Sequence, residues 1–98
     1  METIQLISKE QFCIHNNIEI SFIDSLYDMG LIEIVVKDNL HFIPDEQLSY
    51  IESYSHMHYD LDINIEGIDA IAHLLQRLNE LQENMIQLKN RLRIYEEY

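Results

Sequence analysis

The chain has 98 residues, of which 47% are hydrophobic, and this suffices for one folded domain with a modest core. Eighteen acidic residues stand against six basic ones, so the formal net charge is −12 at pH 7. These values argue against a disordered chain and against a protein that binds nucleic acid through its own positive charge.

Several features predict a cytoplasmic protein without a membrane segment. No apolar run is long enough to span a bilayer, and Met1-Glu2-Thr3-Ile4 lacks the basic start of a signal peptide. The single cysteine, Cys13, cannot build a disulfide framework, which fits a reducing compartment.

The charge is distributed unevenly along the chain. Residues 1–76 hold only Lys9 and Lys37 against 14 acidic residues, a net charge of −12, whereas four basic and four acidic residues make residues 77–98 neutral. An acidic body of this kind repels phosphate and favours basic protein surfaces. For any single carboxylate, the alternative is an ordinary solvated position.

The first part of the chain predicts a short arm and a helix-turn-helix. Ile4 and Leu6 alternate with polar residues in an extended arm, and Ser8-Lys9-Glu10-Gln11 forms a capping box that begins a helix ending at about His15. Asn16-Asn17 predicts a turn, because Asn tolerates left-handed backbone.

The second helix is expected from about Glu19 to Met29, with Gly30 as its C-terminal stop. Its predicted buried side holds Phe22, Ile23 and Leu26. Next, the apolar runs 34–36 and 40–42 flank the turn-forming triplet 37–39, which predicts a small β-hairpin, the wing.

A third helix is expected to follow the wing. Pro44 suits its first turn, where Asp45 and Glu46 complement the helix dipole. Residues 60–64 predict a break, with Asn64 as the cap of a fourth helix. The expected buried stripe of the third helix consists of Leu48, Ile51, Met57 or His58, and Leu61.

The last third of the chain carries a heptad repeat of apolar residues, spaced alternately by three and four. A stripe this narrow predicts a homodimer seam; the alternative is a helix that packs back on its own domain along its first half. We expect a body at residues 1–76 and a coiled-coil dimerisation helix at 77–98. The seam residues are Ile71, Leu74, Leu78, Leu81, Met85, Leu88, Leu92 and Tyr95.

The sequence holds little that points to catalysis, a cofactor or a metal. Cys13-Ile14-His15 and His56-Met57-His58 lack the four-ligand spacing of a structural zinc site, and Cys13 between Phe12 and Ile14 predicts a core thiol. There is no glycine-rich phosphate loop. We therefore expect no enzyme, no cofactor and no metal site.

The helix-turn-helix has the shape of a DNA reader but lacks the charge of one. DNA binding needs several Lys or Arg contacts to phosphates, and base reading uses Arg, Asn or Gln. The helix from Glu19 to Met29 has none of these residues, and the wing offers Lys37 alone, beside Asp38.

The order of arm, helix-turn-helix, wing, two helices and terminal coiled coil resembles the MerR-type winged helix-turn-helix proteins. More closely, the chain resembles the CbpM chaperone modulators, a MerR-like branch, over nearly its whole length. The most specific segments are Phe12-Cys13-Ile14-His15 and Gly67-Ile68. Weaker points of likeness are Leu26, Met29-Gly30-Leu31-Ile32-Glu33, Phe42, Leu61, Ile63 and Leu88-Lys89-Asn90-Arg91-Leu92.

The resemblance implies a mainly α, winged helix-turn-helix fold with a C-terminal coiled-coil helix. It also implies a protein that binds and inhibits the J-domain of a CbpA/DnaJ-type co-chaperone. The chain departs from MerR regulators at the recognition helix, where residues 22–28 carry Asp24 and Asp28 in place of an Arg-Tyr-type sequence. Glu19 stands where a Ser cap is usual in the modulators.

The expected partner contacts are acidic residues of the body. Asp24 and Asp28 lie four apart on one face of the second helix, Glu33 follows it, and Asp45 and Glu46 lie beyond the wing. One alternative is a MerR-like transcription regulator that binds DNA as a dimer. Another is an acidic adaptor for some other basic protein.

Overall fold

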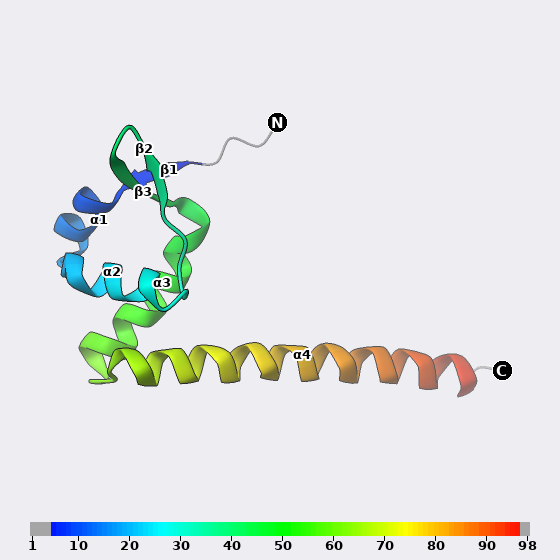
Figure 1. Ribbon diagram of the computed structural model, residues 1–98. Helices are drawn as coiled ribbons and strands as arrows, with labels where there is room; N and C mark the ends of the chain where they lie inside the picture. The colour runs from blue at the N-terminus through cyan, green and yellow to red at the C-terminus, as the bar shows by residue number, and fades with distance from the viewer. Residues whose placement is uncertain (1–4, 97–98) are drawn as a thin grey trace.

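The computed structural model describes residues 5–96 as a small body from which one long helix projects (Figure 1). The body holds three short strands and three α-helices, and the fold is the mainly helical, winged helix-turn-helix with a long C-terminal helix that the sequence predicted. The elements are β1 (Leu6–Ser8), α1 (Lys9–Asn16), α2 (Ile20–Asp28), β2 (Val35–Lys37), β3 (Leu40–Pro44), the 3₁₀ turn η1 (Asp45–Gln47), α3 (Leu48–Ser55), the π-helical turn η2 (His56–Asp60) and α4 (Ile65–Glu96).

The helix-turn-helix is confirmed, and its ends follow from local chemistry. The Ser8 hydroxyl accepts a hydrogen bond from the Gln11 backbone N–H at 3.5 Å, which is one of the two bonds of a capping box. Asn17 ends α1 with a left-handed φ of 54°. Glu19 caps α2 without a side-chain hydrogen bond, and its backbone N–H donates instead to the Tyr59 hydroxyl at 3.1 Å.

The wing is confirmed as the hairpin β2–β3, but its turn is shorter than predicted. Lys37 pairs with Leu40, so only Asp38 and Asn39 form the turn, with φ of 51° and 64°. Two positive φ values are typical of a type I′ hairpin turn. The predicted arm becomes strand β1, which pairs antiparallel with β3 at the other edge of the sheet. Ile4, also assigned to the arm, lies outside the described residues.

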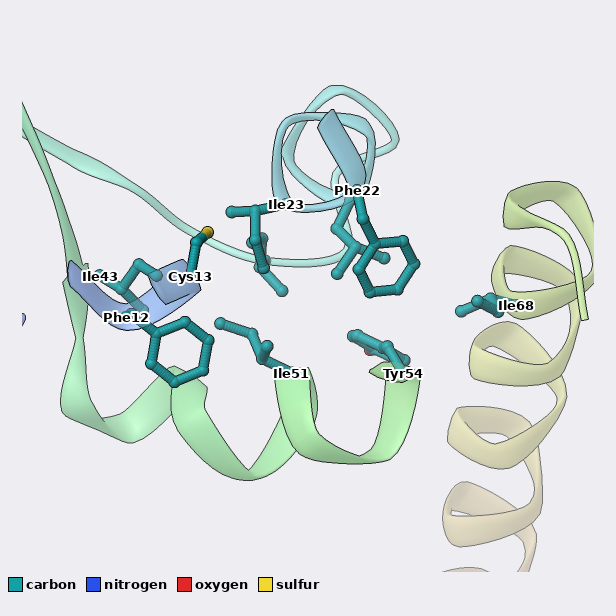
Figure 2. Close-up of a cluster of buried hydrophobic side chains, with 10 residues drawn as sticks. Phe12, Cys13, Phe22, Ile23, Ile43, Ile51, Tyr54 and Ile68 are labelled. Atoms are coloured by element: carbon teal, nitrogen blue, oxygen red, sulfur yellow. The ribbon is translucent and has the colours of Figure 1, made fainter. Parts of the chain in front are cut away.

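The hydrophobic core forms where α1, α2, α3 and β3 meet, as Figure 2 shows. Phe22, Ile23 and Leu26 are buried as predicted, and Cys13 is a core thiol with 3% of its surface exposed. Ile68 reaches into this cluster from α4, which attaches the long helix to the body (Figure 2). The buried residues are Phe12, Cys13, Phe22, Ile23, Leu26, Ile32, Ile43, Ile51, Tyr54 and Ile68.

The third helix differs from the prediction at both ends. Pro44 is the last residue of β3 and only precedes the 3₁₀ turn. Leu61 was expected on the buried stripe but is 55% exposed, because the helix ends in the π-helical turn η2 and Asp62 then takes a left-handed φ of 56°. The wider turn of η2 brings both Met57 and His58 into partly buried positions.

The fourth helix begins as expected and is longer than any other element. The Asn64 side chain accepts a hydrogen bond from the Gly67 backbone N–H at 2.8 Å. A Cβ at residue 67 would lie 2.7 Å from Ile63 Cγ2, so glycine allows the helix to start close to this loop. The 32 residues of α4 extend about 48 Å, and most of that length projects past the body (Figure 1).

Candidate protein-binding surface

The elements that read DNA in a winged helix carry almost no positive charge here. Helix α2 contains no Lys or Arg. Lys9 lies on the neighbouring helix α1, and its ammonium group contacts Asp24 Oδ1 at 2.9 Å, with 14% of its side chain exposed. Lys37 on β2 is exposed but lies beside Asp38. This surface is therefore poorly equipped to neutralise phosphates.

The same elements expose apolar side chains, which were not among the predicted partner contacts. They are Ile20 and Tyr27 on α2, Met29 just after it, and Val36 and Leu40 on the wing, each between 40% and 61% exposed. Apolar groups among carboxylates are more typical of a protein-binding surface than of a DNA-binding one.

The structure places all five predicted acidic contacts at the surface of the body. Asp24 pairs with Lys9 while 49% of its side chain stays exposed, and Asp28, Glu33, Asp45 and Glu46 are exposed. The Glu33 backbone N–H donates to Gln47 Oε1 at 3.1 Å, and this bond holds the loop after α2 against η1, which carries Asp45 and Glu46. Three of the five candidates, Glu33, Asp45 and Glu46, thus belong to one neighbourhood, and Asp28 lies at the end of α2 that leads into it.

The apolar stripe of α4 lies open along most of its length. Ile71 is partly buried, and the seven later residues, from Leu74 to Tyr95, are each at least 50% exposed. Contacts to the body come from Ile65, Ile68 and Ala72 instead. Helix α4 therefore packs on its own domain only through its first turns.

An open groove of about 600 Å³ lies between the body and the first part of α4. Three segments meet there: the loop after α2, α3 with the start of η2, and α4. Its larger apolar side chains are those of Met29, Leu31, Tyr50, Tyr54, Met57 and Leu75. This groove was not predicted, because its residues are scattered over some 50 positions of the sequence. Met57 alone among them was assigned to a helix face, and it was expected to be buried.

The histidines make local contacts. His56 Nδ1 lies 2.7 Å from Asp60 Oδ2, and His58 Nδ1 lies 3.0 Å from the Ile63 carbonyl oxygen while its ring stacks on Phe22 at 4.5 Å. Within residues 5–96, no three His, Cys, Asp or Glu side chains come close enough to hold a metal ion. Burial raises the pKa of the Cys13 thiol, which makes the thiolate harder to form.

No helix among the described residues is long and apolar enough to cross a bilayer. Residues 7–90 match the model of a protein family described as "MerR HTH family regulatory protein". Searches of curated proteins and of solved structures found no match. The matched segment runs from β1 through most of α4, and the protein therefore belongs to the MerR HTH family of regulatory proteins.

Proposed function

We propose that this protein is a non-enzymatic modulator that binds the J-domain of a CbpA/DnaJ-type co-chaperone and inhibits it. The observation that carries the proposal is the surface of α2 and the wing, which exposes carboxylates and apolar groups where a DNA reader would present Lys and Arg. The resemblance to CbpM modulators points to the J-domain as the partner.

The mechanism is competitive occlusion of a basic surface. A J-domain engages its Hsp70 chaperone through a basic helix face, as the resemblance implies. The described part of the body carries exposed Asp28, Glu33, Asp45 and Glu46, which attract such a face over distances of about one Debye length. A J-domain covered in this way is blocked from stimulating the chaperone.

The proposal includes a cytoplasmic homodimer joined through α4. The exposed stripe from Leu74 to Tyr95 would lose its contact with water in such a dimer, and this is the usual driving force for coiled-coil pairing. Each dimer would present two acidic bodies to its partners.

The second candidate is a MerR-like transcription regulator that binds DNA as a dimer, and family membership favours it. The small number of basic residues argues against this candidate. Residues 5–76 contain two of them, Lys9 and Lys37, and Lys9 is paired with Asp24. Any DNA contact would then depend on few charges per subunit.

The test is inhibition of J-domain-stimulated ATP hydrolysis by the Hsp70 chaperone. Native protein should inhibit it, whereas the double variant Asp28→Lys, Glu33→Lys should inhibit at least about tenfold less at equal concentration. The double variant Glu80→Lys, Glu83→Lys makes the same charge change on α4, away from the body, and serves as the control. Equal inhibition by the native protein and the Asp28/Glu33 variant would remove these residues from the site.

A further inference from the structure

We propose that the groove between the body and the first part of α4 is a docking site for a basic amphipathic helix of a partner protein. This inference rests on the proposed function, because it adds an apolar anchor to the acidic J-domain site. It differs from the predicted contacts, which were carboxylates only.

The lining suits the apolar face of a helix. Met29 is 40% exposed, Tyr50 54% and Leu75 49%, so these side chains stand at the groove surface rather than in the core. Below them, Tyr54 is buried and Met57 partly buried. Methionine and aromatic side chains adapt to the face of an incoming helix, and grooves of this kind take amphipathic helices with apolar residues at every third or fourth position.

Charge decides which kind of helix fits. None of the described residues that line the groove is Lys or Arg. Asp28 directly precedes Met29, and Glu33 follows Leu31 by two residues, so the loop that forms one wall is bounded by exposed carboxylates. A helix with one apolar face and basic flanks would place its apolar face on the groove lining and its basic residues beside Asp28 and Glu33.

The groove and the dimer stripe occupy different faces of α4. The groove is lined by Ala72, His73, Leu75, Gln76 and Asn79, and none of these belongs to the heptad stripe. Leu74 and Leu78, which do belong to it, point elsewhere because neighbouring positions on a helix are turned about 100° apart. The two sets are therefore centred on different faces of α4 and adjoin at Leu75, which is four residues from Ile71 and three from Leu78.

Two variants with one matched control test the groove. Tyr50→Ala and Leu75→Asn remove exposed groove side chains, and Ile86→Asn changes an α4 residue that is 59% exposed and belongs to neither the groove nor the stripe. Affinity is measured by fluorescence anisotropy with two probes: the J-domain, and a labelled peptide of leucine and lysine, about 16 residues long, designed as an amphipathic helix. Circular dichroism checks the fold, and light scattering the oligomeric state.

The expected result is a loss of affinity of about tenfold or more for both probes in the groove variants, with Ile86→Asn within about twofold of the native protein. Native-like binding of both probes by folded groove variants would overturn the groove and leave the proposed function standing. Peptide binding that depends on the groove, without any J-domain binding, would sustain the groove and sink the proposed partner. A groove variant that becomes monomeric would instead make this face an interface between copies, and that also overturns the inference.

Discussion

Lys9 on α1 and Asp24 on α2 form an ion pair, with Nζ and Oδ1 2.9 Å apart. The pair links the two helices of the helix-turn-helix. Lys9 is one of the few cations that could contact DNA, and Asp24 is one of the carboxylates that were expected to contact the partner. Asp24 therefore contributes to the packing of α1 against α2.

Asp24→Asn should lower the free energy of unfolding by about 1 kcal/mol, since the carboxylate is half-exposed and solvent weakens the pair. J-domain affinity should stay within about twofold of native, because the Asp24 carboxylate is directed toward Lys9, with Oδ1 2.9 Å from its Nζ atom. Urea denaturation and titration calorimetry measure the two effects. A large loss of J-domain affinity without a loss of folding stability would show that Asp24 contacts the partner directly.

The stripe on α4 should pair two chains. Native protein should scatter light as a dimer at tens of micromolar, and Leu81→Asp should shift it to a monomer by placing a charge in the seam, at a cost of several kcal/mol in dimer stability. Glu83→Asp, on the same helix outside the stripe, is the control. A native protein that is monomeric at this concentration would refute the seam.

Stability should fall at alkaline pH through Cys13. Burial raises the pKa of its thiol above the ordinary value of 9.0. The unfolded chain then releases this proton at a lower pH than the folded chain, so the stabilising contribution is complete below pH 9 and is lost as the pH rises toward the folded pKa. Urea melts at about pH 7 and about pH 9.5 should show the loss, and Cys13→Ala should reduce it. The Tyr54 phenol, whose pKa burial also raises from 10.0, should add a similar loss at higher pH. An identical pH dependence in Cys13→Ala would exclude the thiol as its source.

Specific binding to duplex DNA should be absent at physiological salt. The reason is the shortage of cations on α2 and the wing. A gel shift with promoter DNA from the protein's own operon should show no complex at nanomolar protein, whereas a salt-sensitive complex there would favour the transcription regulator. A weak complex seen only at very low salt is expected of any chain with a few Lys and Arg and decides nothing.

Local signals in the sequence were sufficient for several of the helix ends. Ser8 and Asn64 cap their helices, and Asn17 and Gly30 adopt the left-handed backbone that their residue types permit. Each of these features depends on a few neighbouring residues, and each was predicted.

Long-range features could not be predicted in this way. Pairing of Leu6–Ser8 with β3 joins segments more than 30 residues apart, and no local pattern specifies that partner. Tyr54 lies in the core, although the predicted stripe of the third helix did not include it. Leu61 was expected in the core but is exposed, because the π-helical turn before it changes which residues face the core. No clear signal in the sequence predicts such a turn. The groove depends on how α4 sits on the body, so its residues carried no shared motif.

The most direct test of the central claim is the association rate of native protein with the J-domain of the co-chaperone encoded nearest to its gene, measured by stopped-flow fluorescence at low and at physiological salt. The acidic body predicts that the two proteins bind and that the association rate falls steeply as salt is added, because the carboxylates steer a basic partner. Absence of any association at either salt concentration would contradict the proposed function.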